Sequence, residues 1–574
     1  MVKEHKFFIN GEWRTSPRKV QIKNPFNGEI VGEVFFATPD DLEDAVISAQ
    51  NAFEETKKLP SYKRAEILEF ISNEISKRRE EFAEMITKEM GKPISFSRTE
   101  VDRAVFTFKI ASEEAKRING EIIPLDLASH SERRYGLVKR FPIGVILAIT
   151  PFNFPLNLVA HKVAPAIAAG NSIILKPSSQ TPIVSIMLAE IIEKSDYPTG
   201  GFNLVPCKAD EIELLVRDDR IKMVTFTGSS EVGWKLKNIA GKKRVTLELG
   251  GNAAVVVEPD ANLDYAVKRI ALGSFAQAGQ SCIAVQRIYV HKDIYSEFEE
   301  RFVEETKKLK LGNPFEPDTI VGPLVDENAA IKTENWVNEA VQNGAKILIG
   351  GKRNGTFYEP TILVDVKPEM KVSCQEVFAP VVTLEKYDSF EEAIDKVNNS
   401  RYGLQAGVFT NDIRKIFYAG YNVEEVRVYL EMLASEYENL LQENKAMKEK
   451  IAMLETEIST YKQIEKNLHL AVTQAQETAT KTIENAKKQA ELLIKEAELK
   501  AKESIDKAKL EVSKIENEIQ ILKLERDRIL KDLKNLLSSE LEKLNLFESA
   551  TKSETQGKIE EKIKLDDIIK NLEQ

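Results

Sequence analysis

Five short apolar runs between residues 144 and 251 decide the fold of this chain. They read GVILAIT (144–150), SIILKP (172–177), FNLVPC (202–207), MVTFTG (223–228) and VTLELGG (245–251). Continuous runs of this length are typical of buried parallel strands. Helix-length segments separate them, such as LNLVAHKVAPAIAA (156–169) and the residues after Pro182. This alternation predicts a doubly wound α/β fold, whose ligands bind beyond the carboxyl ends of the strands.

The composition changes near Ala419. All 21 prolines lie at or before Pro380, and the only glycines after Ala419 are Gly420 and Gly557. Few residues interrupt helices as strongly as Pro and Gly, so the rest of the chain is predicted to be nearly unbroken helix. The 574 residues therefore divide into an enzyme-like body and a long helical module.

Charge and cysteine content exclude several classes of function. A net charge of -10 argues against a nucleic-acid partner, which would require clustered Lys and Arg. Three scattered cysteines fit neither a disulfide framework nor a zinc cluster, and the five histidines are not at metal-ligand spacing. The start MVKEHKFFING lacks the apolar core of a signal peptide, and no apolar run is long enough to span a bilayer. We expect a cytoplasmic protein without a metal site.

Three polar residues stand next to strand-like runs in the body. Cys282 ends the segment GQSC, where its thiol could be partly exposed and reactive, although a free Cys is more often buried packing. Glu248 precedes two glycines that allow a sharp turn toward a cavity, although a Glu at a strand end is commonly a surface residue. Asn153 stands in ITPFNFP, where a stiff backbone could aim its amide at an oxyanion or simply form a turn.

A second group of residues suits an anionic ligand. Lys176 follows a predicted strand in LKPSS, and FTGSSEVG places Gly228 and Ser229 at a strand-to-helix junction with free backbone N–H groups. The GxGxxG fingerprint is absent, so spacing alone does not establish a dinucleotide site.

Six motifs together resemble the aldehyde dehydrogenase superfamily over about residues 7–419. In order they are PFNFP, LKPSS, FTGSSEVG, LELGG, GQSC and QEVFAP, with 34 residues from Glu248 to Cys282. The resemblance implies a dinucleotide-binding domain over 1–250, an oligomerisation arm at about 119–141, and a catalytic thiol domain over 251–419.

The resemblance also implies the chemistry. Cys282 would attack an aldehyde, and the Asn153 amide with the Cys282 backbone N–H would hold the oxyanion. Glu248 would activate the water that hydrolyses the thioester, and Lys162 would lie near this site. The substrates of similar members are lactaldehyde, succinate semialdehyde or glyceraldehyde 3-phosphate.

The cofactor implied by the resemblance is NAD or NADP. Glu376 would hold the nicotinamide ribose, Lys176 the adenine-side ribose, and FTGSSEVG, with Gly228, Ser229 and Gly233, would complete the site. Ser179 stands where strictly NAD-preferring members often carry an acidic residue that repels a 2'-phosphate, which leaves NADP open.

The family continues for several dozen residues beyond the position of Ala419, with a strand, a Gly-rich loop beside the substrate tunnel and a final strand. None of this is visible here. Residues 120–142 resemble the family's oligomerisation hairpin, which would then have an unpaired edge. We therefore expect a body that is incomplete at its end, with impaired catalysis.

The second module has coiled-coil periodicity. Apolar residues recur at steps of four and three from Val426 to Tyr461, with Asn444 as a polar exception, and again from Val512 to Leu536. Between these stretches Ile483, Ile494 and Ile505 are eleven apart, a repeat typical of a locally right-handed or nearly straight supercoil.

Residues 420–451 resemble the start of the DivIVA-like coiled-coil proteins, and the similarity covers about 420–544. It implies a coiled coil over 420–545, which would make a homo-oligomer, with a polar tail and short helix over 546–574. Family members bind membrane surfaces through preceding residues that end in an exposed aromatic and an Arg. Tyr418 and Ala419 replace them, which argues against membrane association.

Three interpretations remain open at this point. The chain is an aldehyde-oxidising enzyme assembled through both its coiled coil and its dehydrogenase surfaces, or a non-catalytic polar or cell-division scaffold carrying a dehydrogenase remnant. In the third, two unrelated coding segments were joined artificially.

Overall fold

The computed structural model describes residues 2–420 and 516–540, together with scattered helical positions between 480 and 514. The chain falls into two units, residues 1–433 and 434–574. The predicted heptads of residues 426–461 and the predicted tail of residues 546–574 lie outside the described residues, as do most positions of the eleven-residue repeat.

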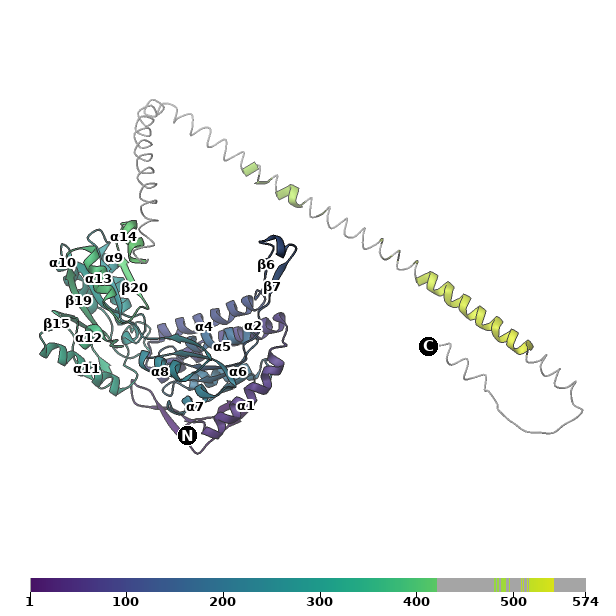
Figure 1. Cartoon of the computed structure of the whole chain (residues 1–574), viewed down its shortest axis with the longest axis horizontal. Helices are drawn as coiled ribbons and strands as arrows, with labels where there is room; N and C mark the ends of the chain where they lie inside the picture. The colour runs from purple at the N-terminus through teal and green to yellow at the C-terminus, as the bar shows by residue number, and fades with distance from the viewer. Residues whose placement is uncertain are drawn as a thin grey trace, which may run out of the picture. The chain divides into compact units, whose positions relative to one another are not determined.

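A seven-stranded sheet forms the core of the first half of the body (Figure 1). The five predicted strands are confirmed as β8 (Val145–Ile149), β9 (Ser172–Lys176), β10 (Phe202–Leu204), β11 (Ile221–Thr227) and β12 (Arg244–Glu248). They are parallel and lie in the order β12-β11-β8-β9-β10. The N-terminal strands β2 (Phe7–Ile9) and β3 (Glu12–Arg14) extend the sheet in antiparallel fashion beside β10.

Helices cover both faces of this sheet because its strands are apolar on both sides. In β8, Ile146 and Ala148 face one hydrophobic cluster, while Val145 and Leu147 face the other. The first cluster contains α5 (Asn157–Ala168) and α6 (Ile183–Glu193), under an outer layer of α2 (Ser61–Lys77), α3 (Arg79–Met90) and α4 (Ile94–Ala115). The second contains α1 (Pro39–Thr56), α7 (Ile212–Arg217) and α8 (Ser230–Ile239).

A second sheet of six strands follows in the order β15-β18-β19-β14-β13-β20. Its strands are β13 (Ala253–Val257), β14 (Val285–His291), β15 (Lys346–Ile349), β18 (Thr361–Val364), β19 (Val381–Tyr387) and β20 (Ala406–Phe409). One face packs on α9 (Leu263–Phe275), α10 (Tyr295–Lys307) and α11 (Glu327–Gln342), and the other on α13 (Phe390–Asn398). The domain boundaries stay predictions; the one at residue 250 falls between the last strand of the first sheet and the first strand of the second.

Small elements complete the body. A three-stranded sheet contains β1 (Glu4–His5), β4 (Lys19–Lys23) and β5 (Ile30–Phe35), and β16 (Arg353–Asn354) pairs with β17 (Phe357–Tyr358). The short helices are η1 (Ser129–Ser131), η2 (Ala276–Gly279) and α12 (Lys371–Cys374).

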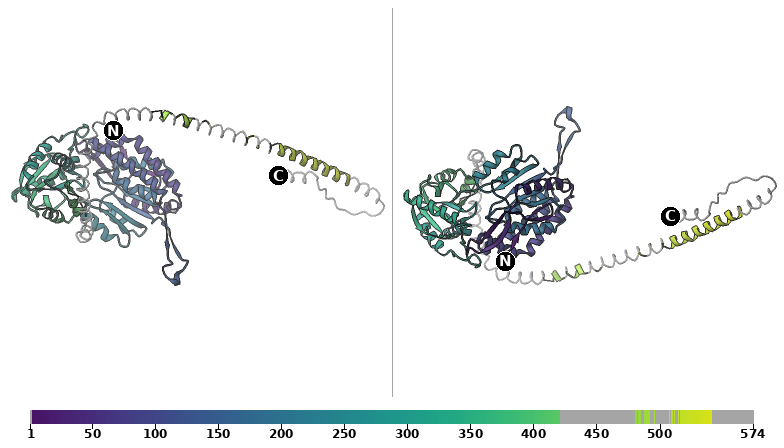
Figure 2. Two further views of the ribbon diagram at one scale, coloured as in Figure 1. Left: turned by 90° about the horizontal axis from the view of Figure 1, so that it is seen from above. Right: turned by 90° about the horizontal axis from the view of Figure 1, so that it is seen from below.

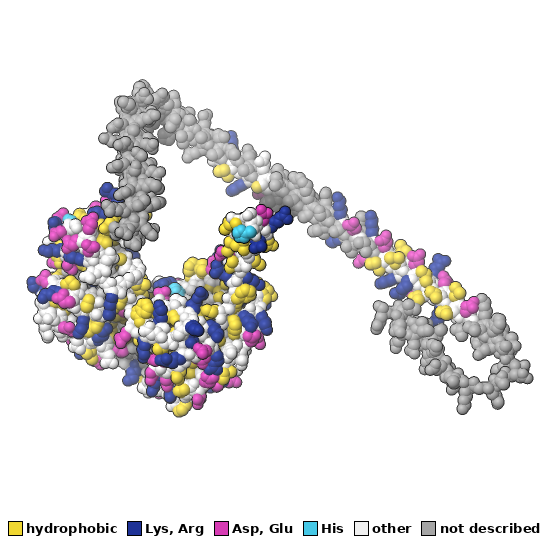
Figure 3. Space-filling view, viewed as in Figure 1, with side chains coloured by type: hydrophobic (Ala, Val, Ile, Leu, Met, Phe, Trp, Pro, Cys, Tyr) yellow, Lys and Arg dark blue, Asp and Glu magenta, His cyan; other side chains and the backbone are white. Residues whose placement is uncertain are grey.

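A hairpin of β6 (Glu121–Pro124) and β7 (Tyr135–Val138) projects from the helical layer, as the views of Figure 2 show. Hydrophobic side chains gather on it (Figure 3). Leu127 is 86% exposed and Phe141 76%. Among the described residues no third strand pairs with this hairpin.

The last helix of the body, α14 (Ile413–Gly420), is fastened to the second sheet. Lys415 forms an ion pair with the buried Glu258, which directly follows β13 and accepts a hydrogen bond of 2.5 Å from the Tyr387 hydroxyl. The ring of Tyr418 lies 6.0 Å from that of Phe390. These contacts tie α14 to the end of β13 and to the start of α13.

The described part of the second module is helical over residues 516–540. Most of its apolar side chains are exposed, including the predicted heptad positions Ile519, Leu522, Ile529, Leu533 and Leu536. In the part of the chain that the structure describes, no helix combines the length and the apolar character needed to cross a bilayer.

Candidate active site

The predicted site residues gather at the carboxyl edge of the first sheet. Lys176 is the last residue of β9 and Glu248 the last of β12, while Asn153 follows β8. Gly228 and Ser229 come directly after β11, where the Gly228 N–H donates to the carbonyl of Glu248 (3.0 Å). Because parallel strands end at one edge, these groups share the position where such sheets bind ligands.

Cys282 lies just beyond a strained turn. Gln277, Ala278 and Gly279 all have positive φ, of 53°, 57° and 68°. A Cβ at Gly279 would lie 2.4 Å from the carbonyl oxygen of Ala379, so glycine is required there. Gln280 fixes the loop through its side chain, which donates to the carbonyl of Pro323 (3.3 Å) and accepts from the N–H of Val325 (2.8 Å). Strain held in this way is common at functional sites.

The two glycines of LELGG bring three predicted site segments into contact. A Cβ at Gly251 would lie 2.2 Å from the carbonyl oxygen of Cys282, and a Cβ at Gly250 would lie 2.1 Å from a carboxylate oxygen of Glu376. The Gly251 N–H also donates to Glu376 Oε1 at 2.9 Å. The turn after Glu248, the Cys282 loop and Glu376 are therefore packed together at a distance that only glycine permits.

Electrostatics around Cys282 favour the neutral thiol. Burial raises the pKa of Cys282, and the neighbouring Glu376 carboxylate adds to the rise. Burial also raises the pKa of Glu376, against the opposing effects of the Gly251 N–H and of Lys332. The thiol is partly buried and forms no disulfide. It therefore has to lose its proton when it reacts with a substrate.

Asn153 reaches toward the Cys282 loop. Its Nδ2 donates to the carbonyl of Gln280 at 3.2 Å, two residues before the thiol. Its Oδ1 is buried and has no hydrogen-bond partner within the described residues. The amide thus lies at the nucleophile loop, where it can donate to a developing oxyanion.

Lys162 lies on α5 with its side chain buried beneath the site. Its Nζ donates to Thr225 Oγ1 at 3.0 Å. Burial lowers the pKa of Lys162 to about 8, and attraction to Glu248 opposes this shift. Lys162 therefore lies within electrostatic range of Glu248, and its part in the active site stays a prediction.

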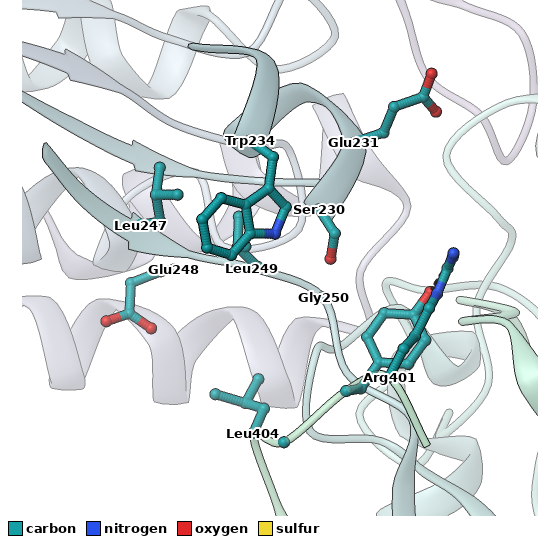
Figure 4. A pocket seen from close by; sticks show the side chains of 11 residues that line it. Ser230, Glu231, Trp234, Leu247, Glu248, Leu249, Gly250, Arg401 and Leu404 are labelled. Carbon is teal, nitrogen blue, oxygen red and sulfur yellow. Dashed lines mark hydrogen bonds between the residues drawn. The ribbon is translucent and has the colours of Figure 1, made fainter. Parts of the chain in front are cut away.

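A cavity of about 680 Å³ adjoins Glu248 (Figure 4). Figure 4 shows the Glu248 side chain at its wall, with Trp234 and Leu249 beside it and Arg401 and Leu404 from the other side. The first turn of α8 contributes Ser230 and Glu231. The remaining lining residues are Leu247, Gly250, Tyr402 and Gly403.

The groups predicted to hold a cofactor are compatible with a nucleotide phosphate. Ser229 precedes α8 and makes no side-chain cap, so the first backbone N–H groups of this helix can donate to a ligand. A Cβ at Gly233 would lie 2.4 Å from the Leu249 side chain, so the helix packs closely on the strand end. Burial lowers the pKa of Lys176, and Ser179 Oγ donates to the carbonyl of Cys207 (3.4 Å).

Sequence reasoning missed two features near Cys282. A second cavity has a volume of about 250 Å³. Its wall contains Ser281 and Ile283, the residues before and after Cys282 in the chain, and Arg103 of α4. A buried ion pair, Lys92 with Glu100, lies under the Asn153 loop. Arg103, Lys92 and Glu100 had no sequence signal, because they occur in ordinary amphipathic helices and their junctions. Among the described residues no group of His, Cys, Asp and Glu is arranged to hold a metal.

Known proteins match both parts of the chain. Residues 13–437 match the model of the aldehyde dehydrogenase family, which extends past Ala419. Residues 410–534 match that of DivIVA protein, so the two matches overlap.

Individual relatives cover most of the body. A 3-sulfolactaldehyde dehydrogenase of Priestia aryabhattai is 46% identical over 424 residues, 74% of this chain and 88% of the relative. The crystal structure of aldehyde dehydrogenase 21 from Physcomitrella patens, in complex with the product succinate, has a TM-score of 0.72 at 44% identity, covering 73% of this chain and 88% of that one. A glyceraldehyde-3-phosphate dehydrogenase of Methanocaldococcus jannaschii complexed with NADP has a TM-score of 0.67 at 40% identity, covering 70% and 88%.

The strand order, the packed Cys282 and Glu376 loops and these matches lead to one conclusion. The chain belongs to the aldehyde dehydrogenase family and is an NAD(P)-dependent oxidoreductase acting on small aldehydes.

Proposed function

We propose that this protein oxidises a short aldehyde with an anionic group to the carboxylic acid, with NAD or NADP, through a thioester on Cys282. One observation carries the proposal. The Cys282 loop, the LELGG turn and Glu376 are in close contact beside the cavity that Glu248 lines.

The residues have distinct roles in this scheme. The Cys282 sulfur forms a bond to the aldehyde carbon, and its proton leaves as the carbonyl oxygen becomes an oxyanion. The Asn153 amide and the Cys282 backbone N–H donate to that oxygen. Glu248 then takes a proton from the water that attacks the thioester, which restores the thiol and releases the acid.

Nicotinamide dinucleotide, when bound, supplies the acceptor for the hydride. The N-terminus of α8 with Gly228, Ser229 and Gly233 would hold its phosphates, and Lys176 and Glu376 its two riboses. Ser179 is small and uncharged, so it would not repel a 2'-phosphate on the adenine-side ribose. We therefore expect NADP to be accepted as well as NAD.

Arg103 supports an anionic substrate. It is exposed, lies in the wall of the cavity beside Ser281 and Ile283, and has no ion pair among the described residues. Its guanidinium carbon lies 5.9 Å from the ring of Phe154, the neighbour of Asn153. The names of three relatives point the same way, because 3-sulfolactaldehyde, glyceraldehyde 3-phosphate and the aldehyde that yields succinate all carry an acidic group. Lactaldehyde, the substrate in the names of other relatives, is uncharged.

Paired substrates test the proposal. Succinate semialdehyde and butanal have equal chain lengths, and we expect kcat/KM for NAD(P)H formation to be higher for the anion. Arg103→Met should lower kcat/KM for succinate semialdehyde about 10- to 100-fold, the contribution of one charged hydrogen bond, and leave butanal nearly unchanged. Arg98→Met is the control, since Arg98 lies on the same helix but pairs with Glu80 (2.9 Å).

Different results would contradict the thiol chemistry and the preference for an anionic aldehyde. Reduced cofactor that also forms with Cys282→Ser would refute thiol chemistry, and reduced cofactor that never forms in the unaltered protein would leave the scaffold interpretation. Equal use of both aldehydes would refute only the anion preference. We expect a modest kcat, because the match covers 88% of the relative's length and the missing part would support the substrate tunnel.

A further inference from the structure

A lysine and a glutamate form a buried ion pair under the Asn153 loop. Lys92 follows Gly91 at the end of α3, and Glu100 lies on α4. Both side chains are 0% exposed. Gly91, with φ of 72°, is held against a second loop, since a Cβ there would lie 2.4 Å from Pro323.

Both members of the pair bind the loop that carries Asn153. Lys92 Nζ donates to the carbonyl oxygen of Asn153 at 2.7 Å and lies 3.9 Å from the ring centroid of Phe154. Glu100 Oε1 accepts from the N–H groups of Leu156 (2.9 Å) and Asn157 (3.1 Å). Leu156 provides no side-chain cap for α5, so Glu100 satisfies the first N–H groups of that helix.

The contacts continue to the nucleophile. Asn153 Nδ2 donates to the carbonyl of Gln280, whose side chain in turn donates to the carbonyl of Pro323. Lys92 and Glu100 thus hold one side of the Asn153 loop while the Cys282 loop holds the other.

Stability alone is a poor explanation for this pair. Removing two charges from water is costly, and buried pairs are often replaced by apolar residues without loss of stability. An oxyanion donor, by contrast, must be held to within about half an ångström.

We propose that Lys92 and Glu100 are positioning residues that orient the Asn153 amide toward the oxyanion formed on Cys282. They do not touch the substrate, and this inference rests on the proposed function of Cys282 and Asn153. The pair acts by fixing the backbone on both sides of Phe154.

The test uses the full chain with the double variant Lys92→Met/Glu100→Gln. It leaves no unpaired charge and keeps an acceptor for α5, but removes the ammonium from Asn153. Arg79→Met/Asp102→Leu is the matched control, because that pair joins the same helices, with 2.6 Å from Nε to Oδ1, without touching the loop.

The main readout is the aldehyde concentration that protects Cys282 from alkylation by iodoacetamide, measured without cofactor. The thiol adds reversibly to the carbonyl, forming a carbon–sulfur bond and moving its proton to oxygen, with no oxidation. We expect the protecting aldehyde concentration to rise about 10-fold in the variant and kcat to fall 10- to 100-fold. The alkylation rate without aldehyde should not change, because alkylation forms no oxyanion.

A cycle with Asn153→Ala identifies the route of the effect. In protein that already carries Asn153→Ala, the double variant Lys92→Met/Glu100→Gln should change the protecting aldehyde concentration less than twofold. The reason is that the pair acts through the Asn153 amide, and the effects of coupled residues are not additive. Full additivity, unchanged protection, or absence of protection in the unaltered protein would each overturn the inference. If the double variant unfolds, Lys92→Met alone, which also removes the ammonium from the Asn153 carbonyl, gives the same readouts. Protection without cofactor reduction would refute the proposed oxidation but support the positioning role.

Discussion

At the residue scale, close packing leaves no room for a side chain at the two glycines that follow Leu249. Gly251 approaches the carbonyl of Cys282 so closely that no side chain fits. This contact joins the end of the first sheet to the nucleophile loop, so it transmits any local shift to the thiol.

Gly251→Ala should therefore impair both folding and activity. A Cβ 2.2 Å from a backbone oxygen forces the Cys282 loop to move, which should cost about 1–3 kcal/mol and lower kcat at least about tenfold. Urea unfolding and steady-state kinetics measure the two effects. Gly407→Ala, with its nearest contact at 3.4 Å, should be neutral, and equal behaviour of both variants would contradict the packing argument.

Lys162 should contribute a pH dependence to stability. Burial lowers its folded-state pKa from 10.5 to about 8, so the unfolded chain binds more protons between these values. The charged, buried Lys162 destabilises the folded protein fully below pH 8, and this destabilisation disappears as the pH rises to 10.5. The free energy of unfolding should therefore rise by about 3 kcal/mol over this range. Relative to Lys162→Met, the unaltered protein should gain stability between pH 7.5 and about 10 in urea melts. Lys109→Met, at an exposed position, should show no such difference.

Local sequence located Cys282, Glu248 and Asn153 as a candidate nucleophile, carboxylate and oxyanion donor. The family resemblance completed these roles and added Glu376, and all of these roles remain predictions. Arg103, Lys92 and Glu100 could not be located in this way. They reach the site from helices whose sequences show only an apolar face, so their position depends on how α3 and α4 pack.

At the element scale, buried strands were predictable because uninterrupted apolar runs have few alternatives. The strand order was not, since it depends on connections across the sheet. The addition of β2 and β3 to the edge beside β10 was also unforeseen, because three-residue strands leave little periodicity.

One helix start depends on a distant carboxylate. Both oxygens of the buried Glu89 accept hydrogen bonds at the start of α6, from the N–H groups of Ile183 (2.6 Å) and Val184 (3.0 Å). Pro182 supplies no cap of its own.

Glu89→Ala should destabilise the body by about 2–4 kcal/mol, because two buried N–H groups lose their acceptor. Glu89→Gln keeps one acceptor oxygen and should therefore lose less stability than Glu89→Ala. Thermal unfolding of both variants measures this order. If Ala and Gln were equally damaging, the capping role would be wrong.

At the scale of the whole molecule, the exposed apolar residues suggest assembly. The hairpin of β6 and β7 and the helix of residues 516–540 both leave large apolar side chains in water. Such a stripe on a helix is stable mainly when it is paired.

We predict that the 64.8 kDa chain forms oligomers through both surfaces. Ile529→Glu combined with Leu536→Glu should lower the mass measured by light scattering, leaving an oligomer held by the hairpin. Lys531→Glu, on the same helix, is the charge control. An unchanged mass in the double variant would exclude pairing through this helix.

The attachment of α14 has a mechanical consequence. Lys415 and Tyr418 fasten this helix to Glu258 and Phe390, and Glu258 directly follows β13. The other end of β13 begins two residues after Gly251, the residue packed on Cys282. A pull on α14 would therefore act first on Glu258 at one end of β13, and this strand leads directly to Gly251, the residue packed against the carbonyl of Cys282.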